Sequence, residues 1–169
     1  IREGNNQTTP LVHDGVMFLA NPGDVVQAID ALTGNVIWEY RSPLPDDARQ
    51  RGPTRTLALY GDKVYLATHD AAIVAIDAAT GSEVWRTVKA DYTQGFNQRG
   101  GPVIAHGVVV SGINGCQRYK EQTCFITGHD PAWIFLGQQD GTPLFAADIS
   151  AMPAYSHAAD GGPGDPGMD

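Results

Sequence analysis

An eleven-residue pattern that occurs twice constrains the fold of this chain more than any other feature. The first copy, residues 28–38, has the sequence AIDALTGNVIW, and the second, residues 75–85, has the sequence AIDAATGSEVW. The tryptophans that close the two copies, Trp38 and Trp85, stand 47 residues apart (38 to 85). An internal repeat at this period is typical of the blades of a β-propeller.

Each copy of the pattern predicts a β-hairpin. An apolar run leads into Asp-x-x-Thr-Gly, and a second apolar run leaves it toward the tryptophan. The aspartate carboxylate accepts hydrogen bonds from the backbone of the turn, and the glycine takes a positive φ that would strain other residues. The tryptophans are expected to pack between neighbouring blades, since burial of a large aromatic ring stabilises an interface. We therefore assign structural roles to six residues: Asp30, Gly34, Trp38, Asp77, Gly81 and Trp85.

A second hairpin signal recurs three times along the chain. Its turn glycines, Gly15, Gly61 and Gly107, are separated by 46 residues at each step (15 to 61 to 107). This predicts an all-β chain of about three propeller blades, each with four antiparallel strands. The expected organisation is a partial propeller over 1–150, with blades at about 8–50, 51–99 and 100–150, and a Gly/Pro-rich loop or tail over 151–169.

The third predicted blade departs from the repeat. Residues 132–139 intervene between its turn and the next apolar run, and Phe145 replaces the tryptophan if that position is the docking one. Whether 132–139 is a true insertion is left open by the sequence. A closed propeller needs at least about four blades, and the chain begins without Met, almost at a strand. We therefore interpret the 169 residues as a fragment of a longer protein, with closure by oligomerisation as the alternative.

Composition excludes some classes of function. A formal net charge of −8 with only 11 Lys and Arg argues against binding to nucleic acid, whose phosphates require a basic surface. No stretch approaches the roughly 20 apolar residues that span a bilayer. The histidines stand mostly in predicted turns at unrelated spacings, so we interpret all five as surface residues: His13, His69, His106, His129 and His157.

The chain has two cysteines, Cys116 and Cys124, at either end of a polar loop between two apolar strands. One interpretation is a small disulfide loop formed in an oxidising compartment, and the alternative is two unrelated thiols, one in each strand. A zinc site is not expected, because no Cys-x-x-Cys or paired histidine spacing accompanies them.

The repeated pattern Ala-x-Asp-x-x-Thr-Gly-x-x-x-Trp resembles the tryptophan-docking motif of the pyrroloquinoline quinone (PQQ)-dependent alcohol dehydrogenases. The order of four further segments extends the resemblance: 6–12, 55–60, 100–103 and 113–117. The resemblance implies an eight-bladed periplasmic propeller that uses PQQ together with calcium or a lanthanide.

The resemblance also implies a set of cofactor-binding residues. Gln7 stands where the family has a carboxylate near the quinone, and Arg55 matches an arginine whose donors suit the cofactor's carboxylates. Arg99 replaces a family threonine. The segment that cradles the quinone aligns with Asn114, Gly115 and Cys116.

The residues that the resemblance implies for metal binding and catalysis are only partly present in this sequence. Gln117 aligns with a metal-binding glutamate but offers only a neutral carbonyl oxygen to a hard cation. The family's catalytic aspartate belongs to a blade beyond this sequence, so no catalytic residue is assigned. The alternative for Gln7, Arg55, Arg99 and Asn114 is that they are solvated turn residues.

Two functions follow from these observations. The first is part of a periplasmic dehydrogenase that oxidises alcohols or similar hydroxyl compounds and passes electrons to a cytochrome or membrane quinone. The remaining blades of the full-length protein complete its site, and attachment to the inner membrane is left open. The second is a non-catalytic propeller scaffold of the outer-membrane protein assembly type, which the two carboxylate-to-amide departures, Gln7 and Gln117, would fit.

Overall fold

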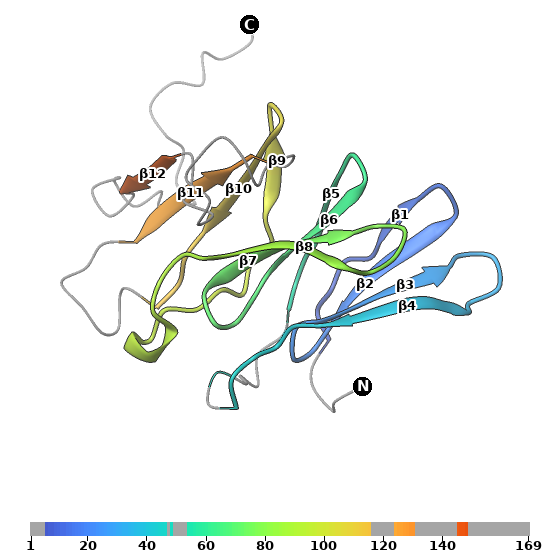
Figure 1. Ribbon diagram of the computed structural model, residues 1–169, viewed down its shortest axis with the longest axis horizontal. Helices are drawn as coiled ribbons and strands as arrows, with labels where there is room; N and C mark the ends of the chain where they lie inside the picture. Colours follow the sequence, from blue (N-terminus) through green and yellow to red (C-terminus); the bar gives the residue numbers. More distant parts are fainter. Residues whose placement is uncertain (1–5, 47, 49–53, 116–123, 131–144, 149–169) are drawn as a thin grey trace, which may run out of the picture.

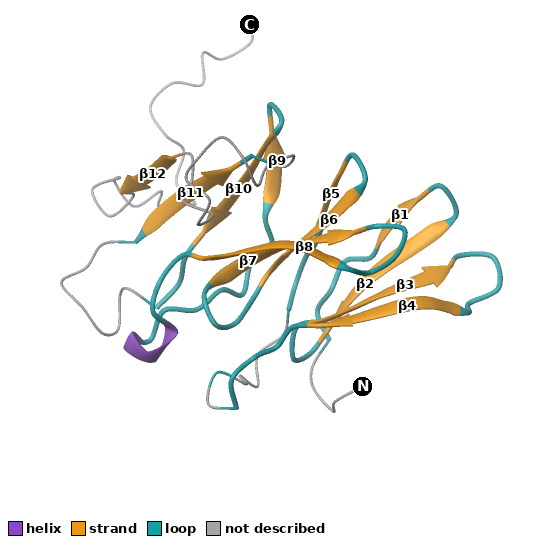
Figure 2. Cartoon of the chain, viewed as in Figure 1, coloured by secondary structure: helices purple, strands orange, loops and turns teal. Residues whose placement is uncertain are grey.

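The computed structural model describes residues 6–46, 48, 54–115 and 124–130, and the backbone of 145–148. In this part of the chain the strands form three antiparallel sheets of four strands each, which stand side by side (Figure 1). Strands and loops make up nearly all of it, with a single 3-10 turn, η1 (Tyr92–Gln94), after the second sheet (Figure 2). The predicted all-β propeller architecture is therefore confirmed.

Each sheet is a meander, in which every strand pairs with the next one along the chain. The first sheet contains β1 (Leu11–His13), β2 (Val16–Asn21), β3 (Val25–Asp30) and β4 (Val36–Arg41). The second contains β5 (Ala58–Tyr60), β6 (Lys63–Ala67), β7 (Ala72–Asp77) and β8 (Glu83–Val88). The third contains β9 (Val103–Ala105), β10 (Val108–Gly112), β11 (Phe125–His129) and β12 (Phe145–Asp148).

Strand register shows that the three sheets are repeats of one unit. In the first sheet one row of paired residues runs Leu11, Phe18, Ala28, Trp38. The matching row of the second sheet runs Ala58, Tyr65, Ala75, Trp85. In the third sheet it runs Val103, Val110, Gly128, Phe145. By register, Phe145 occupies the position of the two tryptophans. The stretch 132–139 lies outside the described residues, as does the predicted tail 151–169, so the predicted domain limits stay predictions.

The hairpin turns have the chemistry expected from their sequence. Asp30 Oδ1 accepts hydrogen bonds from Thr33 N at 2.7 Å, Thr33 Oγ1 at 2.9 Å and Leu32 N at 3.0 Å. Gly34 has a φ of +77°. Hydrogen bonds from the backbone and hydroxyl of Thr33 lower the pKa of Asp30, because they stabilise its charged form. Asp77 makes the same three bonds in the second sheet, and Gly81 also has a φ of +77°.

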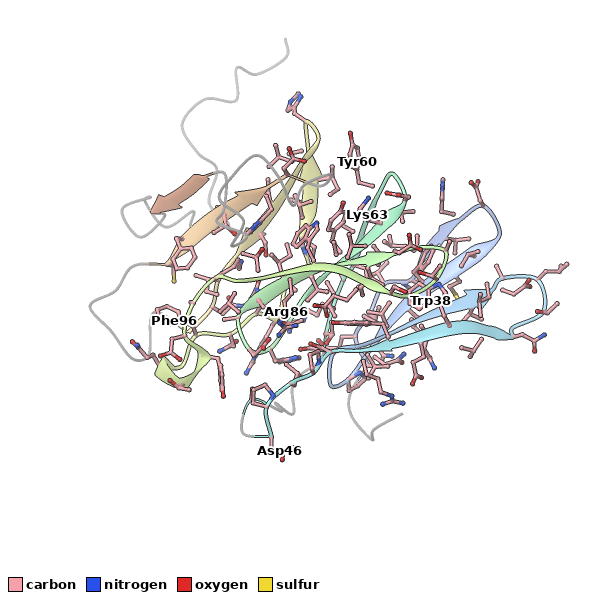
Figure 3. All side chains as sticks on the ribbon, viewed as in Figure 1. Trp38, Asp46, Tyr60, Lys63, Arg86 and Phe96 are labelled. Atoms are coloured by element: carbon pink, nitrogen blue, oxygen red, sulfur yellow. The ribbon has the colours of Figure 1, made fainter. Side chains whose placement is uncertain are left out.

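The first two sheets pack through an apolar core. It contains Val64, Leu66, Val74 and Ile76 of the second sheet, which are fully buried against the row that ends in Trp38. The Trp38 indole Nε1 donates to the Ala78 carbonyl oxygen in the β7–β8 turn at 3.0 Å (Figure 3). A Cβ on Gly81 would lie 2.7 Å from the Trp38 ring. Trp38 is thus seated in the turn of the next blade, as its packing role predicts.

The interface between the second and third sheets is more polar. Register places Val109, Ser111, Thr127 and His129 where the second sheet has Val64, Leu66, Val74 and Ile76 in the equivalent strands. All four are buried. The Trp85 ring stacks on the His129 ring, with centroids 6.1 Å apart, and the buried Trp85 Nε1 has no hydrogen-bond partner. The two tryptophans of the repeat are therefore seated differently.

One interpretation from the sequence, that of the histidines, is wrong, and another, that of the cysteines, stays untested. His69 is 1% exposed and His129 is 4% exposed, so reading all five histidines as surface residues was wrong. Both side chains lie between sheets, where local sequence does not reveal burial.

Cys124 packs beside Ile113 and Phe96, but Cys116 lies outside the described residues. The Cys116–Cys124 disulfide therefore stays a prediction. In the described part, no helix has the length and apolar character to cross a membrane.

Candidate functional site

Three segments, each of which leads into the first strand of a sheet, lie beside one another at one end of the sheets. We call residues 6–10, 54–57 and 97–102 the lead-in segments. The Thr8 hydroxyl donates to the Thr54 carbonyl oxygen at 2.7 Å, and Thr9 N donates to the Arg55 carbonyl oxygen at 3.1 Å. Gly101 N donates to Thr56 Oγ1 at 2.8 Å. These bonds join the leading edges of all three sheets.

The lead-in segments bring together two of the predicted cofactor residues, Gln7 and Arg55. Arg55 Nε donates a hydrogen bond to Gln7 Oε1 at 3.2 Å, although the two residues stand 48 apart in sequence. Both residues are exposed. The pair therefore presents a planar cation and a neutral amide at the surface. That combination suits a ligand that carries carboxylate groups, because a guanidinium binds carboxylates through two parallel hydrogen bonds.

Arg99 belongs to the third lead-in segment and is exposed. It stands four residues before β9 (99 to 103), as Gln7 stands four before β1 (7 to 11). By repeat position, then, Arg99 and Gln7 are equivalent. Among the described residues, no hydrogen bond or ion pair joins Arg99 to Gln7 or Arg55, so its place in the same site stays a prediction.

The predicted cradle segment is described only in part. Asn114 forms a two-bond backbone bridge with Asn97, with N–O distances of 3.0 and 2.8 Å. Gly115 has a φ of +99°, and a Cβ there would lie 2.0 Å from the Gly95 carbonyl oxygen. The close approach that requires glycine is thus to the chain's own backbone. Cys116 and Gln117 lie outside the described residues.

Sequence reasoning missed a buried polar cluster beneath the first two lead-in segments. Asp24, which is 0% exposed, accepts hydrogen bonds from Thr54 Oγ1 at 2.9 Å and from His69 N and Nδ1, both at 2.6 Å. Three donors compensate the carboxylate for its removal from water. The structure places His69 within the unbroken buried run 64–76, but nothing in the local sequence signals that burial.

A second buried polar cluster lies between the second and third sheets. Lys89 Nζ donates to the carbonyl oxygens of Gly112 at 2.6 Å and Ser111 at 3.2 Å, and to Ser111 Oγ at 3.1 Å. Burial lowers the pKa of Lys89 to about 7, because it disfavours the charged ammonium. The Ser111 hydroxyl in turn donates to Gln98 Oε1 at 2.8 Å. This cluster ties β8 and the third lead-in segment to the end of β10.

Within the described ranges, no group of three or more His, Cys, Asp or Glu side chains could hold a metal ion. The predicted metal ligand Gln117 is outside those ranges. The Gln7–Arg55 pair on these blades fits part of a site for an organic acid.

Comparison with known proteins places the chain in a family. The profile of a family described as "Outer membrane protein assembly factor BamB" matches residues 2–151. The quinoprotein alcohol dehydrogenase PedH of Pseudomonas putida is 38% identical over 116 residues, which are 68% of this chain and 20% of that protein. The 1-butanol dehydrogenase (quinone) of Thauera butanivorans is 40% identical over 105 residues, which are 61% of this chain and 17% of that protein.

A solved structure agrees with these relatives. The quinohemoprotein alcohol dehydrogenase from Comamonas testosteroni superposes with a TM-score of 0.72 and 28% identity, over 86% of this chain and 21% of that one. The chain spans about a fifth of the length of the curated relatives it matches. It belongs to the β-propeller family that the matching profile describes, and its relatives place it among the PQQ-dependent alcohol dehydrogenases.

Proposed function

We propose that this chain forms part of a PQQ-dependent dehydrogenase that oxidises alcohols or similar hydroxyl compounds. The observation that carries the proposal is the contact between Gln7 and Arg55 at the end of the first two sheets. Two segments that the family resemblance assigns to the cofactor converge there from different blades. The names of the relatives, which are quinoprotein and quinone-linked alcohol dehydrogenases, support the substrate class.

The residues present fit one end of PQQ, a planar quinone with several carboxylates. The Arg55 guanidinium would hold a carboxylate through paired N–H donors. Because Gln7 Oε1 already accepts from Arg55 Nε, the Gln7 amide N–H groups are the donors it can offer to a second oxygen. When bound, the quinone supplies the two-electron acceptor for alcohol oxidation. This chain's own contribution is to bind and orient it.

The remaining parts of the proposal extend beyond the described residues. A calcium or lanthanide ion would take ligands from Gln117 and from blades outside this sequence, and no step is assigned to it here. Electrons would pass to a cytochrome or membrane quinone in the periplasm. The remaining blades would supply the catalytic carboxylate and the rest of the cofactor pocket.

A scaffold function of the outer-membrane protein assembly type is the second candidate. Two observations favour it: the description of the matching family profile, and the amides at positions 7 and 117 in place of carboxylates. The scaffold would share the docked tryptophans but would bind no quinone.

Equilibrium binding of PQQ in the presence of calcium separates the two candidates. The full-length gene product, its Arg55→Ala variant and an Arg41→Ala control would be titrated and followed by quinone absorbance. Arg41 is a suitable control because it is an exposed arginine on the outer strand β4, paired with Glu39 at 2.6 Å. We expect Arg55→Ala to weaken binding roughly 10-fold to 100-fold, the loss typical of a hydrogen bond to a charged group, and Arg41→Ala to bind normally. Absence of binding by the full-length protein would favour the scaffold.

A further inference from the structure

We propose that Asp24, Thr54 and His69 form a positioning network that holds Arg55 in place for its ligand. The inference rests on the proposed function, in which Arg55 binds the carboxylates of PQQ. None of the three residues is assigned a contact with the quinone. They act through the backbone on either side of Arg55.

The network joins the first and second sheets beneath the lead-in segments. Asp24 belongs to the β2–β3 loop of the first sheet, whereas Thr54 and His69 belong to the second lead-in segment and the β6–β7 loop. All three are buried, with exposures of 0%, 4% and 1%. The Asp24 carboxylate accepts one hydrogen bond from Thr54 and two from His69. A buried carboxylate with three donors has a defined position, since any displacement leaves a charge without compensation.

Hydrogen bonds to the carbonyl groups of Thr54 and Arg55 hold the backbone on both sides of Arg55 in place. The Thr54 carbonyl oxygen accepts from the Thr8 hydroxyl, which also donates to the Ala20 carbonyl oxygen at 2.7 Å. The Arg55 carbonyl oxygen accepts from Thr9 N. The segment that carries Gln7 is thereby fixed against the segment that carries Arg55. A flexible arginine that is ordered before binding loses less conformational freedom when it takes its ligand.

The repeat shows that this network is not needed merely to pack two blades. Ala71 occupies the loop position equivalent to Asp24, 47 residues later (24 to 71), and has a similar positive φ of +61°, compared with +56° for Asp24. Its side chain cannot form the equivalent polar link to the third sheet. Arg99 stands four residues before β9, where Thr54 stands four before β5 (54 to 58). Of the two blade pairs in the described part of the chain, the carboxylate link therefore accompanies the one that carries Gln7 and Arg55.

His69 supports the same conclusion. Because the Asp24 carboxylate is already the acceptor for two other donors, Nδ1 of His69 carries the proton that it donates to Asp24. The other ring nitrogen, Nε2, is buried and has no hydrogen-bond partner. An unpartnered buried nitrogen disfavours the folded state. Histidine at this position is thus explained by the bond from its ring Nδ1 to Asp24 and not by packing, since any residue except proline could supply the backbone N–H bond.

Variants of Thr54 test the proposal with the least disturbance of the fold. Thr54→Val keeps the shape of the side chain and removes its bond to Asp24, whereas Thr54→Ser keeps the hydroxyl. Thr127→Val is the matched control, because Thr127 is also buried, at 1% exposure, and its hydroxyl bonds to Ser111 in the third sheet. Each would be made in the full-length protein, alone and with Arg55→Ala, and titrated with PQQ and calcium well below the unfolding temperature.

We expect Thr54→Val to weaken PQQ binding about threefold to tenfold, the effect of one net hydrogen bond. Thr54→Ser should restore binding to within about twofold, and Thr127→Val should leave it unchanged. With Arg55 already replaced by alanine, Thr54→Val should have no further effect, because a positioning residue acts only through the residue it positions. Wild-type affinity in Thr54→Val, or an equal loss with and without Arg55, would overturn the proposal.

A crystal structure of the wild-type and Thr54→Val proteins keeps this test separate from the proposed function. We expect the Arg55 Nε to Gln7 Oε1 contact to be present in the wild type and broken in the variant. An unchanged contact would overturn the positioning network whether or not the protein binds quinone. Failure of the wild type to bind PQQ would instead overturn the proposed function, and the crystallographic comparison would then decide the network alone.

Discussion

The two turn glycines of the repeat allow the docking of Trp38 to be measured by substitution. Gly34 and Gly81 occupy equivalent positions and share a φ of +77°. A Cβ on Gly34 meets no atom within 4 Å, whereas a Cβ on Gly81 would lie 2.7 Å from two carbon atoms of the Trp38 ring. Gly34→Ala and Gly81→Ala therefore introduce the same backbone strain, but only the second introduces a clash.

The loss of stability in each variant can be estimated from the backbone strain and the steric clash. The left-handed backbone conformation costs an alanine roughly 1–2 kcal/mol in either variant. Overpacking against a fixed ring adds roughly 1–3 kcal/mol in Gly81→Ala alone. We expect Gly81→Ala to lower the free energy of unfolding by about 2 kcal/mol more than Gly34→Ala does.

Equilibrium urea unfolding at 25 °C, followed by both far-UV circular dichroism and tryptophan emission, measures this difference. The two signals must give one transition for the free energies to be comparable. Repeating both substitutions in a Trp38→Ala background isolates the contact, because the clash disappears with the ring. Equal destabilisation by the two substitutions in the wild-type background, or a difference that persists without Trp38, would refute the docking argument.

Three further predictions concern the tryptophans, a buried histidine and the isolated chain. Trp38→Phe should destabilise the fold by about 1 kcal/mol more than Trp85→Phe in the same unfolding assay, because only Trp38 Nε1 donates a hydrogen bond, to Ala78; equal losses would contradict this. Burial, with a smaller contribution from the charge of Lys89, lowers the pKa of His129 from 6.5 to about 4, so the folded state binds less proton than the unfolded state between these values. The free energy of unfolding should therefore fall by about 3 kcal/mol as the pH drops from 6.5 to 4, and urea midpoints of His129→Phe should lack this part of the pH dependence; an unchanged dependence in the variant would count against it. Residues 1–169 alone should show no alcohol oxidation with added PQQ and calcium, and measurable turnover would contradict the view that other blades complete the site.

The pair Gln7 and Arg55 was predictable through the resemblance to the PQQ-dependent alcohol dehydrogenases, and not through the repeat itself. Gln7 and Arg55 were selected by their order along the chain, and the structure brings their side chains within 3.2 Å. The network of Asp24, Thr54 and His69 was not predictable in the same way. Its members stand 30 and 45 residues apart from Asp24 (24 to 54 and 24 to 69), and no local pattern distinguishes a buried histidine in a loop from an exposed one.

The sequence by itself determined the blade repeat, the hairpin turns and the residues that close each blade. These features depend on residues close together in the sequence: an aspartate that accepts hydrogen bonds from the second and third residues after it, and a glycine that accepts a positive φ. Only the tertiary structure decided how the blades use them. It gave Trp38 a hydrogen-bond acceptor in the next turn, left Trp85 Nε1 without one and set it against His129. The physical reason is that partners and burial are properties of the space between two sheets, and residues 40 or more positions apart create that space together.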